Sequence, residues 1–345
     1  MVVVFSADVR ENGSVTVAAK VPRYASGGEQ EDHPSGYLLL EASGNTFDEA
    51  AAMLNATTPH ELNYSQVREI MIGEKAAEDP GFLSMLEKID QLPRFRCSAA
   101  LIVCRGEGRA LASAQKPFIG ERLSRYADSA LSHYAGKGYT PDTDLCAALR
   151  DMGYGLIDPM LILGALNDFS SAQSIGNNPF DEKAGSLPRS SPESMEVFGA
   201  AVTSGSRVCG YLTGYETALL KLAEGRLEGL TLKEKDETIT VSSVRPAKLT
   251  VICNTDPVKL SVSLPCRFSY PSGHPPDEQA AAARIEHDLT QVLRYLQELN
   301  SDALGFGRAA LCLFPTAQAW DAFQWREKYR KASLRVILAP EFTER

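Results

Sequence analysis

The sequence predicts an α+β protein of more than one domain, with mixed or antiparallel sheets that pack against helices. Near the N-terminus, residues 2–9 and 14–21 alternate between apolar and polar side chains about the turn Asn12-Gly13, which is typical of a β-hairpin. Residues 277–300 carry apolar side chains at helical spacing and predict a long amphipathic helix. Between these two features, short strand and helix patterns follow one another in both halves.

The N-terminal half continues with strands and helices in alternation. Residues 37–42 alternate as a strand, and a helix is then expected to begin at Asn45 or Thr46, because Glu49 completes a capping box with Thr46. A helix that begins after Thr140, at Pro141, and stops at Gly153 also follows from its flanking residues. The remaining predictions are strands over 67–72 and 98–104 and helices over 82–89, 120–134 and 141–151.

The clearest change in composition falls in the middle of the chain. Residues 168–193 are rich in Ser, Asn, Gly and Pro and contain few large apolar residues, which favours a linker or a long loop. We therefore predict an N-terminal α+β domain over 1–167, a linker over 168–193 that lets the two halves adjust to each other, and a C-terminal α+β domain over 194–345.

The C-terminal half begins with two strands, 195–203 and 208–212, and a short helix over 214–224 that Gly225 ends. Strands over 238–244, 247–253 and 258–268 precede the long helix, because β-branched residues alternate there. Trp320, Phe323 and Trp325 indicate one more short helix, and residues 334–338 a final strand.

Composition excludes several classes of protein. The 345 residues are 44% hydrophobic and 23% charged, which is ordinary for a globular chain and not for a disordered or fibrous one. A net charge of −9 argues against a general nucleic-acid binder, which needs a basic face. No apolar run approaches the roughly twenty residues that span a bilayer, and the N-terminus lacks the pattern of a signal peptide, so the chain itself is expected to be soluble.

The seven cysteines show no metal-binding or redox pattern. Their number is odd, and neither a C-x-x-C motif nor a Cys/His cluster with zinc spacing occurs. We therefore expect free thiols that pack as small apolar side chains.

No catalytic, cofactor-binding or metal-binding residue is predicted. Phosphate-binding glycine motifs and the G-x-S-x-G motif of hydrolases are missing, and the five histidines are scattered. A basic and aromatic stretch near the C-terminus, with Trp320, Trp325 and Tyr329 beside four cations, could contact anionic lipid or a partner. The favoured interpretation is an amphipathic segment with its aromatic rings in the core and its charges in water; the cations are Arg326, Lys328, Arg330 and Lys331.

Several segments resemble the Ger(x)C family, the C subunits of spore germinant receptors. The strongest match is Asp-x-x-Gly-Phe-Gly at the end of the long helix, followed by Pro, Trp and Trp before the last strand. The strand pair over 196–212 and the Glu-Thr helix after it are also similar, and in the N-terminal half residues 67–117 follow the family's order of elements. The family-signature residues are Asp302, Gly305, Phe306, Gly307, Pro315, Trp320, Trp325 and Glu216, which we interpret as structural.

The resemblance implies a lipoprotein without known catalysis on the outer face of the spore inner membrane. Such proteins act beside membrane-embedded A and B subunits of the same receptor, with no cofactor and no nucleic acid. The family begins with a signal peptide and a lipid-bearing cysteine, whereas the first cysteine here is Cys97. Either the anchor lies outside this chain or this member is unanchored.

Two alternatives to this hypothesis stay open. The first is a soluble extracytoplasmic module that binds a small ligand in a cleft between its domains. The second is a hydrolase whose site has no recognisable motif.

Overall fold

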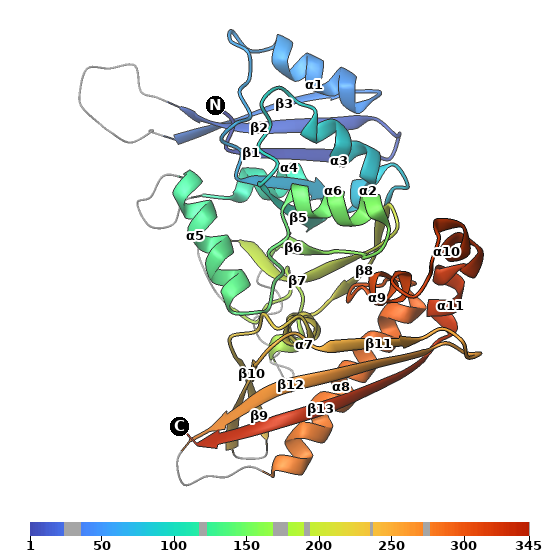
Figure 1. The fold of residues 1–345 in the computed structure, drawn as a ribbon. Helices are drawn as coiled ribbons and strands as arrows, with labels where there is room; N and C mark the ends of the chain where they lie inside the picture. Colours follow the sequence, from blue (N-terminus) through green and yellow to red (C-terminus); the bar gives the residue numbers. More distant parts are fainter. Residues whose placement is uncertain are drawn as a thin grey trace.

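The structure is a computed structural model that describes residues 1–23, 36–116, 123–167, 179–189, 194–234, 237–271 and 277–344. Within these ranges the chain forms two sheets, of eight and five strands, with helices packed against both (Figure 1). The predicted α+β class, with mixed and antiparallel sheets, is confirmed.

The first sheet has a parallel centre and antiparallel sides. Its strand order is β3-β2-β1-β4-β5-β6-β7-β8, in which β1, β4, β5 and β6 run parallel, while β2 and β3 on one side and β7 and β8 on the other are added by antiparallel pairing. The strands are β1 (Val4–Val9), β2 (Val15–Arg23), β3 (Gly36–Gly44), β4 (Glu69–Gly73), β5 (Ala100–Arg105), β6 (Met160–Leu166), β7 (Met195–Ser204) and β8 (Arg207–Leu212).

The central strands are apolar on both faces because helices cover both. One core contains side chains of α1 (Phe47–Ala56), α2 (Glu74–Glu78), α3 (Phe82–Asp90) and α6 (Leu145–Tyr154). The opposite core contains side chains of α4 (Gly108–Ala114) and α5 (Leu123–Gly136). A strand buried in this way is a continuous apolar run rather than an alternating one, which explains why sequence analysis did not assign β6.

Helix α6 begins later than predicted. Residues 141–143 precede it, and Asp144 caps it by accepting a hydrogen bond from the Ala147 N–H at 2.8 Å. The helix ends at Gly155, whose φ of 64° is left-handed, rather than at Gly153. The prediction of a start at Pro141 is therefore wrong, because the carboxylate cap at Asp144, directly before the first buried residue Leu145, sets the first turn.

Part of the predicted linker lies against the first sheet. Strand β6 precedes the predicted linker and β7 follows it, and the two strands pair with each other. Strands β7 and β8, which come after the linker in sequence, therefore belong to the first sheet. Residues 179–189, which include a 3₁₀ turn (Pro179–Asp181), are held by the buried Glu196, whose carboxylate accepts hydrogen bonds from the Gly185 N–H at 2.7 Å and the Arg189 Nε at 2.6 Å. Residues 168–178 and 190–193 lie outside the described residues. The division into domains at 168–193 stays a prediction.

The second sheet surrounds one long strand. Strand β12 pairs in parallel with β13 over its whole length on one side, and with β11 and then β10 on the other. Helix α8 (Glu278–Glu298) covers one face, and α7 (Gly214–Ala223) is buried between the two sheets. The strands are β9 (Leu230–Glu234), β10 (Glu237–Ser243), β11 (Lys248–Ile252), β12 (Lys259–Tyr270) and β13 (Ser333–Glu344).

Three short helices connect α8 to β13. They are α9 (Phe306–Leu311), α10 (Ala317–Phe323) and α11 (Trp325–Lys331), so the single short helix predicted around Trp320 is in fact two. Gln324, with a left-handed φ of 55°, separates α10 from α11.

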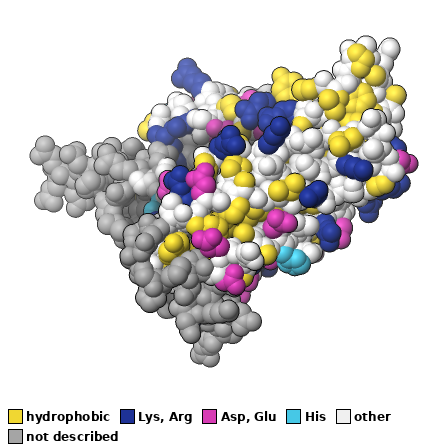
Figure 2. Space-filling view, turned by 60° about the horizontal axis from the view of Figure 1, so that its bottom comes forward, with side chains coloured by type: hydrophobic (Ala, Val, Ile, Leu, Met, Phe, Trp, Pro, Cys, Tyr) yellow, Lys and Arg dark blue, Asp and Glu magenta, His cyan; other side chains and the backbone are white. Residues whose placement is uncertain are grey.

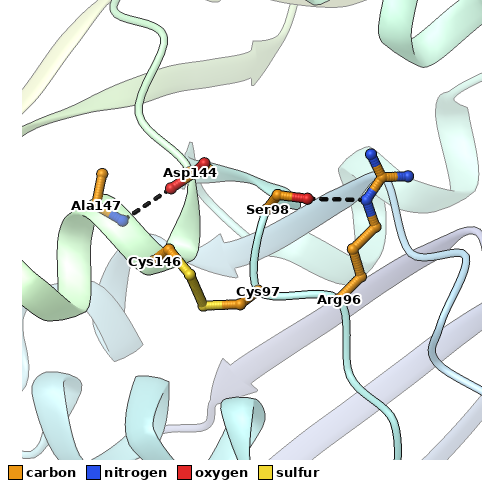
Figure 3. The surroundings of a disulfide bond; sticks show 6 residues. All are labelled: Arg96, Cys97, Ser98, Asp144, Cys146 and Ala147. Carbon is orange, nitrogen blue, oxygen red and sulfur yellow. Dashed lines mark hydrogen bonds between the residues drawn. A yellow bond between two sulfur atoms is a disulfide. The ribbon is translucent and has the colours of Figure 1, made fainter.

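Two of the seven cysteines form a disulfide. Cys97, just before β5, is bonded to Cys146 in the first turn of α6, with their Cα atoms 5.1 Å apart (Figure 3). The Cys146 N–H also donates to the Cys97 carbonyl at 3.0 Å. The prediction of seven free thiols is therefore wrong for this pair, since a separation of 49 residues left no local pattern to reveal it.

The surface carries charges of both signs. Figure 2 shows Lys and Arg side chains intermixed with Asp, Glu and hydrophobic side chains over the described part of one face.

Candidate functional site

Five of the eight family-signature residues meet where α8 ends, at the joint between the two sheets. The centre of the cluster is Asp302, whose buried carboxylate accepts hydrogen bonds from four N–H groups. Its Oδ1 accepts from the N–H of Gly305 at 3.1 Å and of Phe306 at 2.8 Å. Its Oδ2 accepts from the Gly307 N–H at 2.5 Å and from the Trp325 Nε1 at 3.3 Å. Asp302 therefore binds the free N–H groups at the start of α9 and fixes the ring of Trp325.

The two glycines of the cluster are required by its geometry. Gly305 has a left-handed φ of 79°, which residues with a side chain rarely adopt. A Cβ on Gly307 would lie 2.7 Å from the Trp325 Nε1 and 3.1 Å from the Asp302 Oδ2, which is closer than packed atoms approach. The Gly-Phe-Gly pattern thus allows the backbone to approach both the carboxylate and the indole.

A second carboxylate, Asp158, links this cluster to the first sheet. Asp158 lies just before β6, its side chain is 1% exposed, and its Oδ2 accepts a hydrogen bond from the Asp302 N–H at 2.7 Å. Its Oδ1 accepts from the Gly205 N–H, in the turn between β7 and β8, at 2.9 Å. Arg326 of α11 donates to both oxygens of Asp158, from Nη1 to Oδ2 and from Nη2 to Oδ1, the latter at 2.8 Å. Its Nη1 also donates to the Asn300 carbonyl at 3.0 Å. We call Asp158, Asp302 and Arg326, with these partners, the carboxylate joint.

The electrostatics of the joint place a charge where water is excluded. Burial raises the pKa of the Asp302 carboxyl to about 6; its hydrogen bonds from the backbone and from Trp325 oppose the shift, and the negative charge of Asp158 adds to it. Arg326 supplies the positive charge that the two carboxylates share. This arrangement holds the start of α9, helix α11 and the entry to β6 together.

The other signature residues lie farther from the joint. The ring of Trp320 stacks on that of Trp325 with centroids 5.9 Å apart, and Pro315 is exposed directly before Thr316, which caps α10. Glu216 completes a capping box with Thr213 at the start of α7. The Glu216 N–H donates to the Thr213 hydroxyl oxygen at 3.2 Å, and the Thr213 N–H donates to the Glu216 carboxylate at 2.8 Å.

The basic and aromatic stretch is divided between interior and surface. Trp325 and Tyr329 are buried, as the amphipathic interpretation predicts. Arg326 does not follow that interpretation, because its side chain turns inward and pairs with Asp158. Helix α10 has no buried residue, and Leu313 just before it is 58% exposed.

Sequence analysis missed Asp158 and Arg326. The available indication was that Asp158 interrupts the apolar run over 156–166, because a charge at the entry to a buried strand requires a partner. Within the described ranges, no group of three or more His, Cys, Asp or Glu residues could hold a metal ion, and no helix is long and apolar enough to cross a membrane.

Two family models and a solved structure match this chain. The family model described as spore germination protein N-terminal domain matches residues 1–164, and the one described as spore germination B3/GerAC like, C-terminal, matches residues 198–338. No curated protein matches the chain. A solved structure titled "Crystal Structure of the GerBC protein" is similar with a TM-score of 0.57 and 13% identity, over 98% of this chain and 96% of that one, which shows a shared fold.

Proposed function

The chain belongs to the family of GerAC-like spore germination proteins, and from this membership we propose that it is the C subunit of a nutrient germinant receptor. The observation that carries the proposal is that the N- and C-terminal models of the family match the two halves of one chain in order. In this role the protein acts beside membrane-embedded A and B subunits and catalyses no reaction.

The signature residues have a structural role in this proposal. Asp302, Gly305, Phe306, Gly307 and Trp325 fix the joint, while Glu216, Pro315 and Trp320 set the ends and packing of nearby helices. What supports this role is that each polar atom of Asp302 already has partners within the chain. A subunit that works by contact needs its surfaces held in fixed relation, and the joint connects both sheets.

We place the subunit on the outer face of the spore inner membrane, attached by an N-terminal lipid. The disulfide between Cys97 and Cys146 supports a location outside the cytoplasm, because disulfides form and persist in oxidising compartments. One lipid chain binds a membrane weakly, so stable residence would also need contacts with the other subunits.

The surface that we propose for those contacts is α10 with the residues before it. Its large apolar side chains are not enclosed by the described part of the chain: Leu313 is 58% exposed, and Phe314, Trp320 and Phe323 are partly exposed around one another. Exposed aromatic residues of this kind are enriched at the centres of protein interfaces.

Genetic complementation tests the proposal. Deleting the gene should abolish germination with the nutrient of its receptor, and the native gene should restore it. A Leu313→Asp gene should restore it poorly, whereas Ile337→Asp, which changes an exposed apolar residue on β13, should restore it fully. Normal nutrient germination of the deletion strain, in a background without a second copy, would contradict the proposed function.

A further inference from the structure

A cavity of about 580 Å³ lies beside the carboxylate joint, between the two sheets. Its walls are α6 with the residues before it, the entry to β6, the C-terminal end of α7, the start of β11, and the side chains of Ala303, Leu304 and Arg308. This volume is in the range of sites that hold small molecules. No residue that the joint uses lines it, so the cavity is a separate feature of the fold.

Most charged groups on the cavity wall are paired within the protein. Arg150 bonds to Asp151 through two contacts of 2.8 and 3.0 Å. Asp142 lies 3.3 Å from the Nζ of the buried Lys221 and 3.5 Å from the Nη1 of Arg226. Arg150 and Asp151 compensate each other, whereas Lys221 and Arg226 together carry one positive charge more than Asp142.

Two charged side chains of opposite sign remain. The Glu224 carboxylate, at the end of α7, and the Arg308 guanidinium, in α9, make no hydrogen bond or ion pair with any side chain or backbone group of the described residues. Glu224 is half-buried, and burial raises the pKa of its carboxyl, with the charges of Lys221 and Arg226 opposing the shift. A half-buried carboxylate without a hydrogen-bond donor is stabilised by any cation that reaches it.

The rest of the wall includes apolar side chains. Ile157, Met160, Leu249 and Leu304 line the cavity together with the two unpaired charges. An occupant that complements this wall has a positive group, a negative group and a hydrocarbon part.

We propose that the cavity binds a small zwitterion, with the ammonium group of the ligand at Glu224 and its carboxylate at Arg308. Arginine binds carboxylates through two parallel hydrogen bonds, and each charge-assisted bond favours a ligand that carries both groups over one that lacks either. The inference rests on the geometry of the cavity and not on the proposed receptor role, since binding is measured on the isolated chain.

Isothermal titration with unbranched ω-amino acids tests this site. The probes are 3-aminopropanoate, 4-aminobutanoate, 6-aminohexanoate and 8-aminooctanoate, compared with hexanoate and hexylamine, which each lack one charge. We expect saturable binding that peaks at one chain length, because Glu224 and Arg308 are held on the wall of one cavity by different helices. At that length, removing either charged group from the ligand should weaken binding roughly tenfold or more.

Two variants assign the charges. Arg308→Gln should abolish the preference for the zwitterion over hexylamine, which lacks the carboxylate. Glu224→Gln should abolish the preference for the zwitterion over hexanoate, which lacks the ammonium group. Arg335→Gln and Glu87→Gln, which change exposed residues away from the cavity, should leave the affinity unchanged. Thermal unfolding of each variant confirms that it is folded.

Three results would overturn the proposal. The first is that no ω-amino acid saturates the wild-type protein up to about 10 mM. The second is equal binding of hexanoate or hexylamine and of the zwitterion of matched length. The third is that the affinity is unaffected by both cavity variants.

Discussion

Replacing Arg326 with glutamine removes the only cation that the described residues place against Asp158. The Asp158 side chain is 1% exposed and would be left charged or would take up a proton, while the N–H groups of Gly205 and Asp302 still bond to it. Breaking a buried ion pair on one side typically costs 3–5 kcal/mol, and because Arg326 is itself 31% exposed we expect the lower end, about 3 kcal/mol. If all 345 residues unfold together, this corresponds to a fall in Tm of roughly 4 °C.

Urea denaturation followed by tryptophan fluorescence measures this change, because Trp325 lies in the joint. Arg330→Gln is the matched control: it removes an exposed arginine of the same helix and should change the free energy of unfolding by less than about 0.5 kcal/mol. The double variant with Asp158→Asn should recover part of the loss, since both charges are then gone. If Arg326→Gln unfolds within about 0.5 kcal/mol of the wild type, the ion pair does not stabilise the joint and our reasoning about it is wrong.

Three further perturbations probe the same architecture. Gly307→Ala puts a methyl group 2.7 Å from the Trp325 Nε1 and should cost about 1–3 kcal/mol in urea denaturation, with a change in tryptophan emission; wild-type stability would show that the turn relaxes freely. Because the pKa of Asp302 is about 6 when folded and about 4 when unfolded, the folded state holds its proton more tightly, so the contribution of this group to stability falls by roughly 2 kcal/mol as the pH rises from 4 to 6. Unfolding curves of Asp302→Asn should lack this fall, and an identical pH dependence of both proteins would rule it out. Cys97→Ser with Cys146→Ser opens a loop of 49 residues and should lower the free energy of unfolding by about 2–4 kcal/mol; no difference between oxidised and reduced wild-type protein would contradict that.

Local patterns predicted most of the elements because short-range chemistry determines them. The hairpin about Asn12-Gly13 forms β1 and β2, and Thr46 caps α1 with its hydroxyl accepting from the Glu49 N–H at 3.2 Å. The stripe over 277–300 forms α8. In each case the residues that decide the structure lie within a few positions of one another.

Contacts between residues far apart in the chain could not be predicted from the sequence. Asp158 and Arg326 are 168 residues apart, and Cys97 and Cys146 are 49 apart, so neither pair leaves a periodic trace. The family signature identified Asp302 and its neighbours in sequence, which form one side of the joint. The residues at the first sheet that bind them, Asp158 and Gly205, could be identified only from the structure. The pairing of β6 with β7 across the predicted linker is another long-range contact of this kind.

The central claim, that this chain is a subunit of a membrane-embedded receptor, is tested most directly by affinity purification. The native gene, with its own N-terminus and a C-terminal tag, is expressed in sporulating cells, and the spore inner membrane is solubilised in mild detergent. We predict that two polytopic membrane proteins, the A and B subunits, co-purify with the tagged protein and that the Leu313→Asp variant recovers less of them. Recovery of the tagged protein from the soluble fraction alone, with neither membrane protein attached, would contradict the claim.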